Sequence, residues 1–199
     1  RSCRGGTYMI EDIFRTPVYS TQLDIDNDKL WQDCLKIKRQ YKKGLLVSNR
    51  GGYQSAQLLG LEVDSFKQLA NTIAQHGGDF SKHINLEVEK LKDLWFNVNY
   101  YKDYNLLHDH FGSENRLSGV YYVKAPKDCG KIILYHPGKY VEHSWGIKTQ
   151  TGKHNEWTGS IWKHEAKPGK LIIFPAWLEH SVEHNLSKSP RVSFSFNIA

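Results

Sequence analysis

The C-terminal stretch Arg191-Val192-Ser193-Phe194-Ser195-Phe196-Asn197-Ile198 alternates strictly between polar and apolar side chains. This period of two predicts a β-strand with one polar and one apolar face. Two arrangements fit the pattern equally well. Either the polar face meets solvent, as in most sheets, or the apolar face packs on helices and the polar face lines the mouth of a barrel.

Further strand candidates precede this stretch. Short runs rich in Val, Ile, Tyr, Phe and Trp are separated by turn residues over 85–100, 104–110, 117–124, 131–136, 170–174 and 179–184. This spacing is typical of an all-β sandwich or jelly roll. Residues 9–23 are expected to be extended, and Pro17 argues against a central position in a sheet because proline cannot donate to the ladder.

The first half of the chain predicts two helices. One is expected to begin at Asp26 or Asn27, which can cap it, and to run to about Lys43. The other is expected over about 64–76, capped by Asp64 and stopped by Gly77-Gly78. A turn-rich loop over 48–55 lies between them. The sequence therefore predicts a mainly β fold, with the helices supplied first and the β core after them.

Composition limits the class of protein. The 199 residues suit one domain, and the 13% of aromatic residues favours a β-rich core or a lined pocket. No apolar run approaches the roughly 20 residues of a membrane helix. Three cysteines without a CxxC pair argue against a disulfide scaffold and a zinc ribbon, so we expect a reducing, cytoplasmic location. The ten histidines prompt a search for a metal site.

The net charge of +6 favours anionic partners, but much of it falls in the helical stretch 36–43. We interpret that stretch as a solvated helix face and do not expect a nucleic-acid partner. Residues 1–8 lack the apolar core of a secretory leader, and Met9 is the only methionine. Residues 1–8 are therefore expected to be a non-native remnant or a disordered lead, and residues 9–199 a single domain.

Three histidines and one arginine form the candidate site. His108 and His110 lie two apart in a predicted strand, so both imidazoles can reach one metal ion. His180 lies far downstream, and Arg191 follows it on the polar face of the last strand. This pattern suits a mononuclear iron site with open coordination positions. The guanidinium fork of Arg191 can hold the far carboxylate of a dicarboxylic co-substrate.

These pieces, with others in the same order, resemble a known superfamily. The other pieces are Ser48-Asn-Arg-Gly-Gly-Tyr-Gln-Ser55, Trp95-Phe-Asn-Val-Asn99, Leu117-Ser-Gly-Val-Tyr-Tyr-Val123 and the stretch from Pro168 to Val182. From about residue 9 to the C-terminus the chain resembles the iron(II)- and 2-oxoglutarate-dependent oxygenases. It is most similar to a group of small members found in bacteria and phages.

The resemblance implies a double-stranded β-helix (jelly roll, cupin-like) with two or more N-terminal helices packed on one sheet. It implies Fe(2+) held by His108, His110 and His180, with 2-oxoglutarate anchored by Arg191. It further implies a dioxygenase that uses O2 to hydroxylate a C–H bond and releases succinate and CO2. The substrate, a small molecule or a peptide, is not identified by the sequence.

Three more residues are implied at the co-substrate: Tyr121, Asn97 and Ser193. Either Tyr121 or Tyr122 faces inward on this strand, and alternation alone does not say which. We carry Tyr121 forward as the candidate.

The chain departs from the superfamily at one ligand. The usual motif is His-x-Asp, whereas here His110 occupies the third position. With three neutral imidazoles the iron keeps its full double positive charge, which favours an anionic co-substrate. Asp109 is the alternative ligand, but neighbours on a strand point to opposite sides, so it more readily accepts a hydrogen bond that orients an imidazole.

Residues 138–167 form the longest irregular stretch and contain several Trp and His residues. Either it is a lid or substrate wall over the iron, or it is an ordinary β extension. An exposed aromatic loop could also pair two protomers into a homodimer. Two rival functions share the same barrel: a cupin-like three-histidine metal dioxygenase that does not use 2-oxoglutarate, and a non-catalytic binding module.

Overall fold

The computed structural model describes residues 9–112, 114–138 and 153–199. Two helices lie in these ranges, α1 (Asn27–Gln40) and α2 (Asp64–His83). The strands of the same ranges are β1 (Tyr19–Gln22), β2 (Asn49–Arg50), β3 (Tyr53–Gln54), β4 (Leu91–Asn99), β5 (Tyr104–His108), β6 (Leu117–Lys124), β7 (Lys131–Tyr135), β8 (Ile161–Glu165), β9 (Lys170–Pro175), β10 (His180–Val182) and β11 (Arg191–Ile198). The expected lead of residues 1–8 lies outside the described residues.

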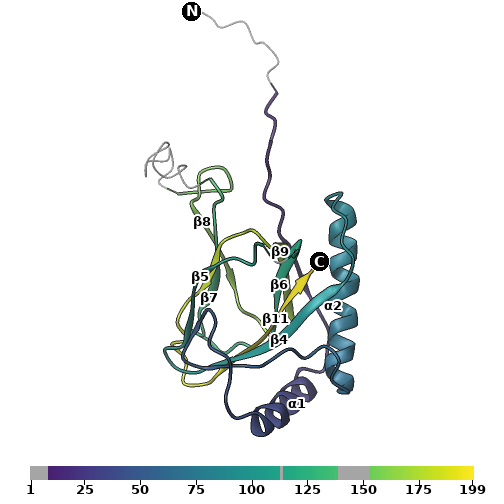
Figure 1. Ribbon diagram of the computed structural model, residues 1–199. Coiled ribbons are helices and arrows are strands. Elements are labelled where there is room, and N and C mark those ends of the chain that lie inside the picture. The colour runs from purple at the N-terminus through teal and green to yellow at the C-terminus, as the bar shows by residue number, and fades with distance from the viewer. Residues whose placement is uncertain (1–8, 113, 139–152) are drawn as a thin grey trace, which may run out of the picture.

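The strands form two antiparallel sheets arranged as a jelly roll (Figure 1). One sheet has the order β1-β9-β6-β11-β4-β3, and the other has the order β2-β5-β10-β7-β8. Helices α1 and α2 both pack on the first sheet, through one apolar core shared with β4, β6, β9 and β11. This is the predicted mainly β architecture with N-terminal helices on one sheet. Within the described ranges, neither helix combines the length and the apolar composition needed to cross a membrane.

Strand β11 lies between β4 and β6, in the middle of the helix-covered sheet. Its apolar residues Val192, Phe194, Phe196 and Ile198 are buried in the core beneath the helices. Its polar residues Arg191, Ser193, Ser195 and Asn197 line a cavity on the other face of the sheet. The second of the two arrangements left open by the alternation is therefore the one that forms.

Helix α2 differs from the prediction at both ends. It runs through Gly77 and Gly78 to His83, and its N-cap is Val63 rather than Asp64. A Cβ at position 77 would lie 2.3 Å from Cδ1 of Ile198. Gly77 therefore lets the helix approach β11 closely, and this packing outweighs the roughly 1 kcal/mol by which glycine disfavours a helix. Asp64 is the first helical residue, where its charge complements the positive end of the helix dipole.

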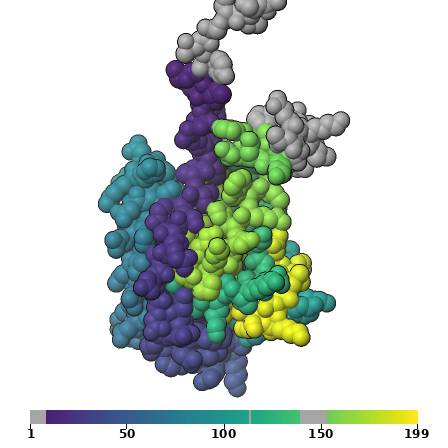
Figure 2. Space-filling view, turned by 180° about the vertical axis from the view of Figure 1, so that it is seen from behind, coloured from purple at the N-terminus to yellow at the C-terminus, as the bar shows by residue number. Residues whose placement is uncertain are grey.

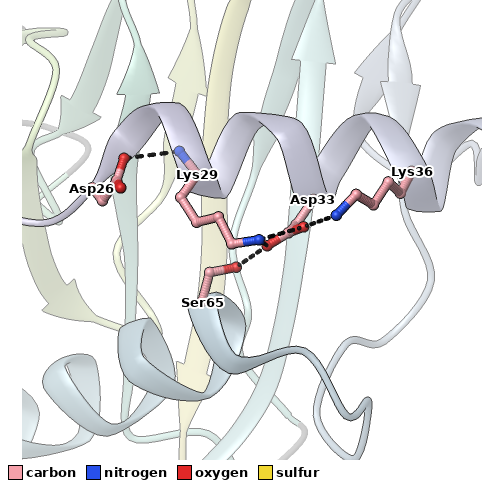
Figure 3. A network of polar contacts seen from close by, with 5 residues as sticks. All are labelled: Asp26, Lys29, Asp33, Lys36 and Ser65. Carbon is pink, nitrogen blue, oxygen red and sulfur yellow. Dashed lines mark hydrogen bonds and ion pairs between the residues drawn. The ribbon is translucent and has the colours of Figure 1, made fainter.

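Helix α1 begins where expected and ends slightly earlier, at Gln40. Asp26 caps it by accepting a hydrogen bond from the N–H of Lys29 at 2.9 Å. A buried polar network joins α1 to the start of α2 (Figure 3). There, Asp33 accepts hydrogen bonds from Ser65 of α2 at 2.8 Å and from Lys36 at 2.8 Å.

We expect this network to make stability depend on pH at the acidic end. Burial alone raises the pKa of Asp33, but the hydrogen bonds from Lys36, Ser65 and Lys29 outweigh it and lower the pKa. A carboxylate with a depressed folded-state pKa stabilises the fold above the unfolded value of about 3.9, and this contribution is lost as pH falls through the folded-state pKa. Asp33→Asn should therefore cost about 1.5–3 kcal/mol at pH 7 and less near pH 3, which is below the unfolded-state value. Urea unfolding at both pH values measures this, and an equal cost at both would contradict it.

Several short elements escaped the sequence prediction. The loop expected over 48–55 contains β2 and β3, joined by Gly51 and Gly52, whose φ angles are 72° and 68°. Strand β8 lies within the stretch expected to be irregular and pairs with β7. Residues 139–152 of that stretch lie outside the described residues, so the lid and homodimer remain predictions. Strand β1 forms after Pro17 at the edge of its sheet, as expected. Figure 2, a view from behind, shows the described N-terminal residues in purple along the face turned to the reader.

Candidate metal and co-substrate site

A cavity of about 410 Å3 lies between the two sheets. Its floor is mostly polar, because β4 and β11 turn their polar residues into it and their apolar residues toward the helices. The three candidate histidines and Arg191 all line this one cavity. The structure thus brings together four residues that the sequence places up to about eighty positions apart.

The three imidazoles form a cluster. Each offers one ring nitrogen, and these three atoms lie within 4.8 Å of one another. His108 ends β5 and is paired with His180 at the start of β10. His110 lies beyond the end of β5, and its N–H donates to the carbonyl of Ala176 at 2.9 Å. The predicted strand is thus too long by two residues, yet both histidines of the pair reach the cluster.

Hydrogen bonds at Nδ1 orient each ring. His108 donates to the carbonyl of Leu106 at 2.7 Å, and His180 donates to the carbonyl of Leu178 at 2.9 Å. His110 donates to the side-chain oxygen of Asn197 at 2.5 Å. With the proton held at Nδ1, each Nε2 carries a free lone pair, which is the form that binds a metal.

Burial keeps these rings neutral. Desolvation lowers the pKa of His108 and of His110, and it lowers the pKa of His180 to about 3, with the neighbouring His108 as the next cause. Neutral imidazoles do not have to lose a proton before they coordinate a metal near pH 7. The donor set therefore fits iron(II), which imidazole ligands suit.

Asp109 lies outside the cluster. It is exposed, lines the cavity, and accepts a hydrogen bond from the N–H of Phe111 at 3.0 Å. Among the described residues, the group that could hold a metal consists of the three histidines. The geometry thus favours His110 over Asp109 as the third ligand.

Arg191 is the most deeply buried charge of the cavity, with 1% of its surface exposed. Its Nη1 donates to the carbonyl of Cys129 and, at 3.3 Å, to the carbonyl of Glu183. Its Nη2 is buried without a partner, and no ion pair to it occurs among the described residues. Leaving a buried donor of a charged group without a hydrogen bond costs free energy, so an anion that pairs with it binds more tightly. A carboxylate of 2-oxoglutarate is an anion that fits this guanidinium.

Asn97 and Ser193 face each other across β4 and β11 and both line the cavity. The Nδ2 of Asn97 donates to Ser195 at 3.2 Å, while its Oδ1 is buried without a partner. Both residues therefore line the cavity that also holds Arg191, and their role at the co-substrate stays a prediction.

The prediction that Tyr121, and not Tyr122, faces the cavity is wrong. Its side chain lies in the core beneath the helices, and its hydroxyl donates to Asn27 of α1 at 2.8 Å. Tyr122 lines the cavity instead. The parity of β6 decides this, since Ser118, Val120 and Tyr122 face the cavity. Burial raises the pKa of Tyr122 to about 12, with Arg191 opposing the shift, so the phenol keeps its proton and can donate.

Two further residues of the site went unassigned in the sequence. Asn197 lies on the polar face of the last strand and contacts His110, and Asp93 lies opposite it on β4. The alternation of β11 shows that Asn197 faces the same way as Arg191, but no local pattern marks its contact with a ligand. Asp93 has no sequence signal at all, because its role depends on the register of β4 against β11.

A jelly-roll cavity with three clustered imidazoles that could hold a metal ion, and a buried arginine beside them, is the arrangement expected of a mononuclear non-haem metal enzyme. A family model described as "Putative 2OG-Fe(II) oxygenase" matches residues 93–197, which is more than half of the chain. The chain belongs to this family of 2OG-Fe(II) oxygenases. No curated protein matches it in sequence.

Solved structures agree with this assignment at the level of the fold. A prolyl-4-hydroxylase from Pseudomonas putida superposes with a TM-score of 0.68 at 14% identity, covering 92% of each chain. The carbocyclase SnoK of nogalamycin biosynthesis superposes with a TM-score of 0.67 at 12% identity, covering 92% of this chain and 79% of its own. A Trichoplax adhaerens prolyl hydroxylase, solved with a hypoxia inducible factor peptide, has a TM-score of 0.66 at 13% identity and covers 91% and 82%. The predicted double-stranded β-helix is confirmed.

Proposed function

We propose that this protein is an iron(II)- and 2-oxoglutarate-dependent dioxygenase that hydroxylates a C–H bond. In the overall reaction, R–H, O2 and 2-oxoglutarate give R–OH, succinate and CO2, with one oxygen atom entering the product and one entering succinate. The observation that carries the proposal is the unpartnered Nη2 of Arg191, buried in the same cavity as three imidazoles. A metal site alone does not require that arginine, whereas a dicarboxylate that spans from the metal to the cavity floor does.

The residues of the cavity would have two different roles, metal binding and co-substrate binding. His108, His110 and His180 would hold the iron, and Arg191 would bind the distal carboxylate of 2-oxoglutarate. When bound, iron(II) would supply the dioxygen activation that protein side chains cannot provide. The protein contributes the alignment of the co-substrate and a cavity whose floor is shielded from bulk water.

The substrate would enter beside the iron. Leu45, Val47 and Phe111 line the cavity and are exposed at 49%, 64% and 76%. This apolar rim supports a small molecule or a peptide as substrate and gives no support to a nucleic acid. The prolyl hydroxylases among the similar structures make prolyl peptides the first peptides to try.

A substrate panel tests the proposal. Prolyl peptides, free amino acids, lipids and nucleic acids are incubated with iron(II), 2-oxoglutarate and air, and succinate is measured together with the mass of each candidate. We expect one class of small molecule or peptide to gain one oxygen atom in step with succinate release. Oxidation of a substrate without 2-oxoglutarate would favour the three-histidine dioxygenase that does not use this co-substrate.

Substitutions of Tyr122 and Tyr121 should have different effects on the KM for 2-oxoglutarate in the same assay. Tyr122→Phe removes a hydroxyl that lines the cavity near Arg191, so we expect the KM for 2-oxoglutarate to rise about tenfold, as for one lost hydrogen bond to a charged group. Tyr121→Phe removes only the bond to Asn27 and should lower stability without changing that KM. The reverse pattern would show that β6 faces the other way.

A further inference from the structure

The three clustered histidines are not oriented by the same kind of group. His108 and His180 each donate from Nδ1 to a backbone carbonyl two residues upstream, and a carbonyl can only accept. His110 donates to the side-chain amide of Asn197. An amide can present either its oxygen or its NH2 group, so it fixes the tautomer of His110 only if its own orientation is fixed.

Asp93 supplies that constraint. The Nδ2 of Asn197 donates to Oδ2 of Asp93 at 2.9 Å, and a carboxylate can only accept. The amide oxygen must then face His110, where Ser118 also donates to it at 3.0 Å. The second oxygen of Asp93 accepts from Nε2 of Gln57 at 3.1 Å.

Gln57 is itself fixed in orientation. Its Oε1 accepts hydrogen bonds from the backbone N–H groups of Leu58, Leu59 and Leu94, at 3.0, 3.2 and 2.8 Å. Its NH2 group must therefore face Asp93. From the backbone to the amide of Asn197, every donor and acceptor is thus assigned. The Ser118 hydroxyl is the exception, since its one proton can point to Oδ1 of Asn197, to the carbonyl of Phe196 or to Nδ1 of His110.

We propose that Asp93 is a positioning residue of the metal site, acting on His110 through Asn197. It turns the amide so that His110 carries its proton on Nδ1 and presents the Nε2 lone pair to the metal. With the amide reversed, its NH2 group would face Nδ1 and the proton would move to Nε2, which could then not coordinate. The proposal rests on the proposed function only in taking the three imidazoles as metal ligands.

The strand register and the stacking of the ring support this assignment. Asp93 and Asn197 are direct partners in the β4–β11 pairing, and both line the cavity. Trp95, also on β4, stacks on the His110 ring with centroids 5.9 Å apart and planes 21° apart. The ligand that departs from the His-x-Asp pattern is thus the one whose ring contacts side chains of β4, β6 and β11. Asp93 lies two hydrogen bonds away from it.

Exchange of the side chains at positions 93 and 197 tests this chain of hydrogen bonds from Asp93 through Asn197 to His110, which we call the relay. Asp93→Asn leaves one oxygen to serve two NH2 groups, those of Gln57 and Asn197, so one of them must turn away. We expect the affinity of the metal-free protein for cobalt(II) to fall about 10- to 100-fold, the range typical of lost outer-shell partners. Asn197→Asp alone sets two carboxylates side by side and should weaken binding similarly.

The double exchange Asp93→Asn with Asn197→Asp restores every donor–acceptor pair. The new carboxylate at position 197 accepts from His110 and Ser118, and the new amide at position 93 donates to it and accepts from Gln57. We expect cobalt(II) affinity within a few-fold of the wild type. Affinity is measured by competition with a chromophoric chelator, and the visible spectrum of bound cobalt(II) reports whether His110 remains a ligand.

Asp33→Asn is the matched control, since it removes another buried, hydrogen-bonded carboxylate on the far side of the helix-covered sheet. It should lower the melting temperature and leave cobalt(II) affinity unchanged. Wild-type affinity in Asp93→Asn, or no recovery in the double exchange, would overturn the relay, and the second result applies even if a single variant does not fold. A wild-type protein that binds no cobalt(II) would instead contradict the proposed function.

Discussion

His180→Ala is expected to abolish metal binding and 2-oxoglutarate turnover while the fold persists. His180 is 5% exposed, and its ring centroid lies 4.3 Å from that of His108 and 5.3 Å from that of His110. Its loss leaves two imidazoles, which is too few for a stable mononuclear site. Because loss of an outer-shell partner alone costs 10- to 100-fold in affinity, we expect more than about 100-fold here.

The fold should tolerate this change because His180 lies at the cavity and not in the core beneath the helices. Metal content and cobalt(II) affinity measure the first part, and thermal unfolding measures the second. His164→Ala is a suitable control, since His164 lies on β8 and its pKa is also lowered by burial. Normal succinate production by His180→Ala would refute the assignment of the site.

Arg191→Ala should have the second large effect, on the co-substrate. Truncating one partner of a buried charge pair typically costs about 3–5 kcal/mol, which corresponds to a rise of roughly 10²- to 10³-fold or more in the Kd of 2-oxoglutarate. Arg191→Lys keeps the charge but loses the planar fork, so its effect should be clearly smaller. Calorimetric titration of 2-oxoglutarate into the metal-loaded variants measures both.

The two arginine variants also separate binding from structure. Arg191 donates to the carbonyls of Cys129 and Glu183, so Arg191→Ala leaves acceptors behind and is expected to lower stability as well. Thermal unfolding monitors this loss. Equal loss of 2-oxoglutarate binding in the Lys and Ala variants would mean that Arg191 is structural.

The last strand shows what the sequence could and could not predict. Its alternation predicted a two-faced strand and placed Arg191 and Asn197 on one face. It did not say which face met the helices, because that depends on elements more than a hundred residues away. The same limit explains the error at Tyr121. Two adjacent tyrosines have opposite orientations, and only the packing of β6 against α1 selects between them.

Other differences have equally local causes. Gly77 and Gly78 indicated a helix end, but Gly77 is needed for contact with Ile198 and the helix continues. Spacing predicted that His108 and His110 could reach one metal ion, and the resemblance added His180. In the structure one ring nitrogen of each of the three lies within 4.8 Å of the others. Asp93 could not be found in this way, since its importance arises only from its register opposite Asn197.

The central claim is that one cavity holds the metal and 2-oxoglutarate together. Its most direct test is calorimetric titration of 2-oxoglutarate into the iron(II)-loaded protein without oxygen, and into the metal-free protein. We predict one molecule bound per chain to the metal-loaded protein, with much weaker binding when the metal is absent or Arg191 is replaced by alanine. The absence of 2-oxoglutarate binding to the iron-loaded protein, or binding indifferent to the metal, would contradict it.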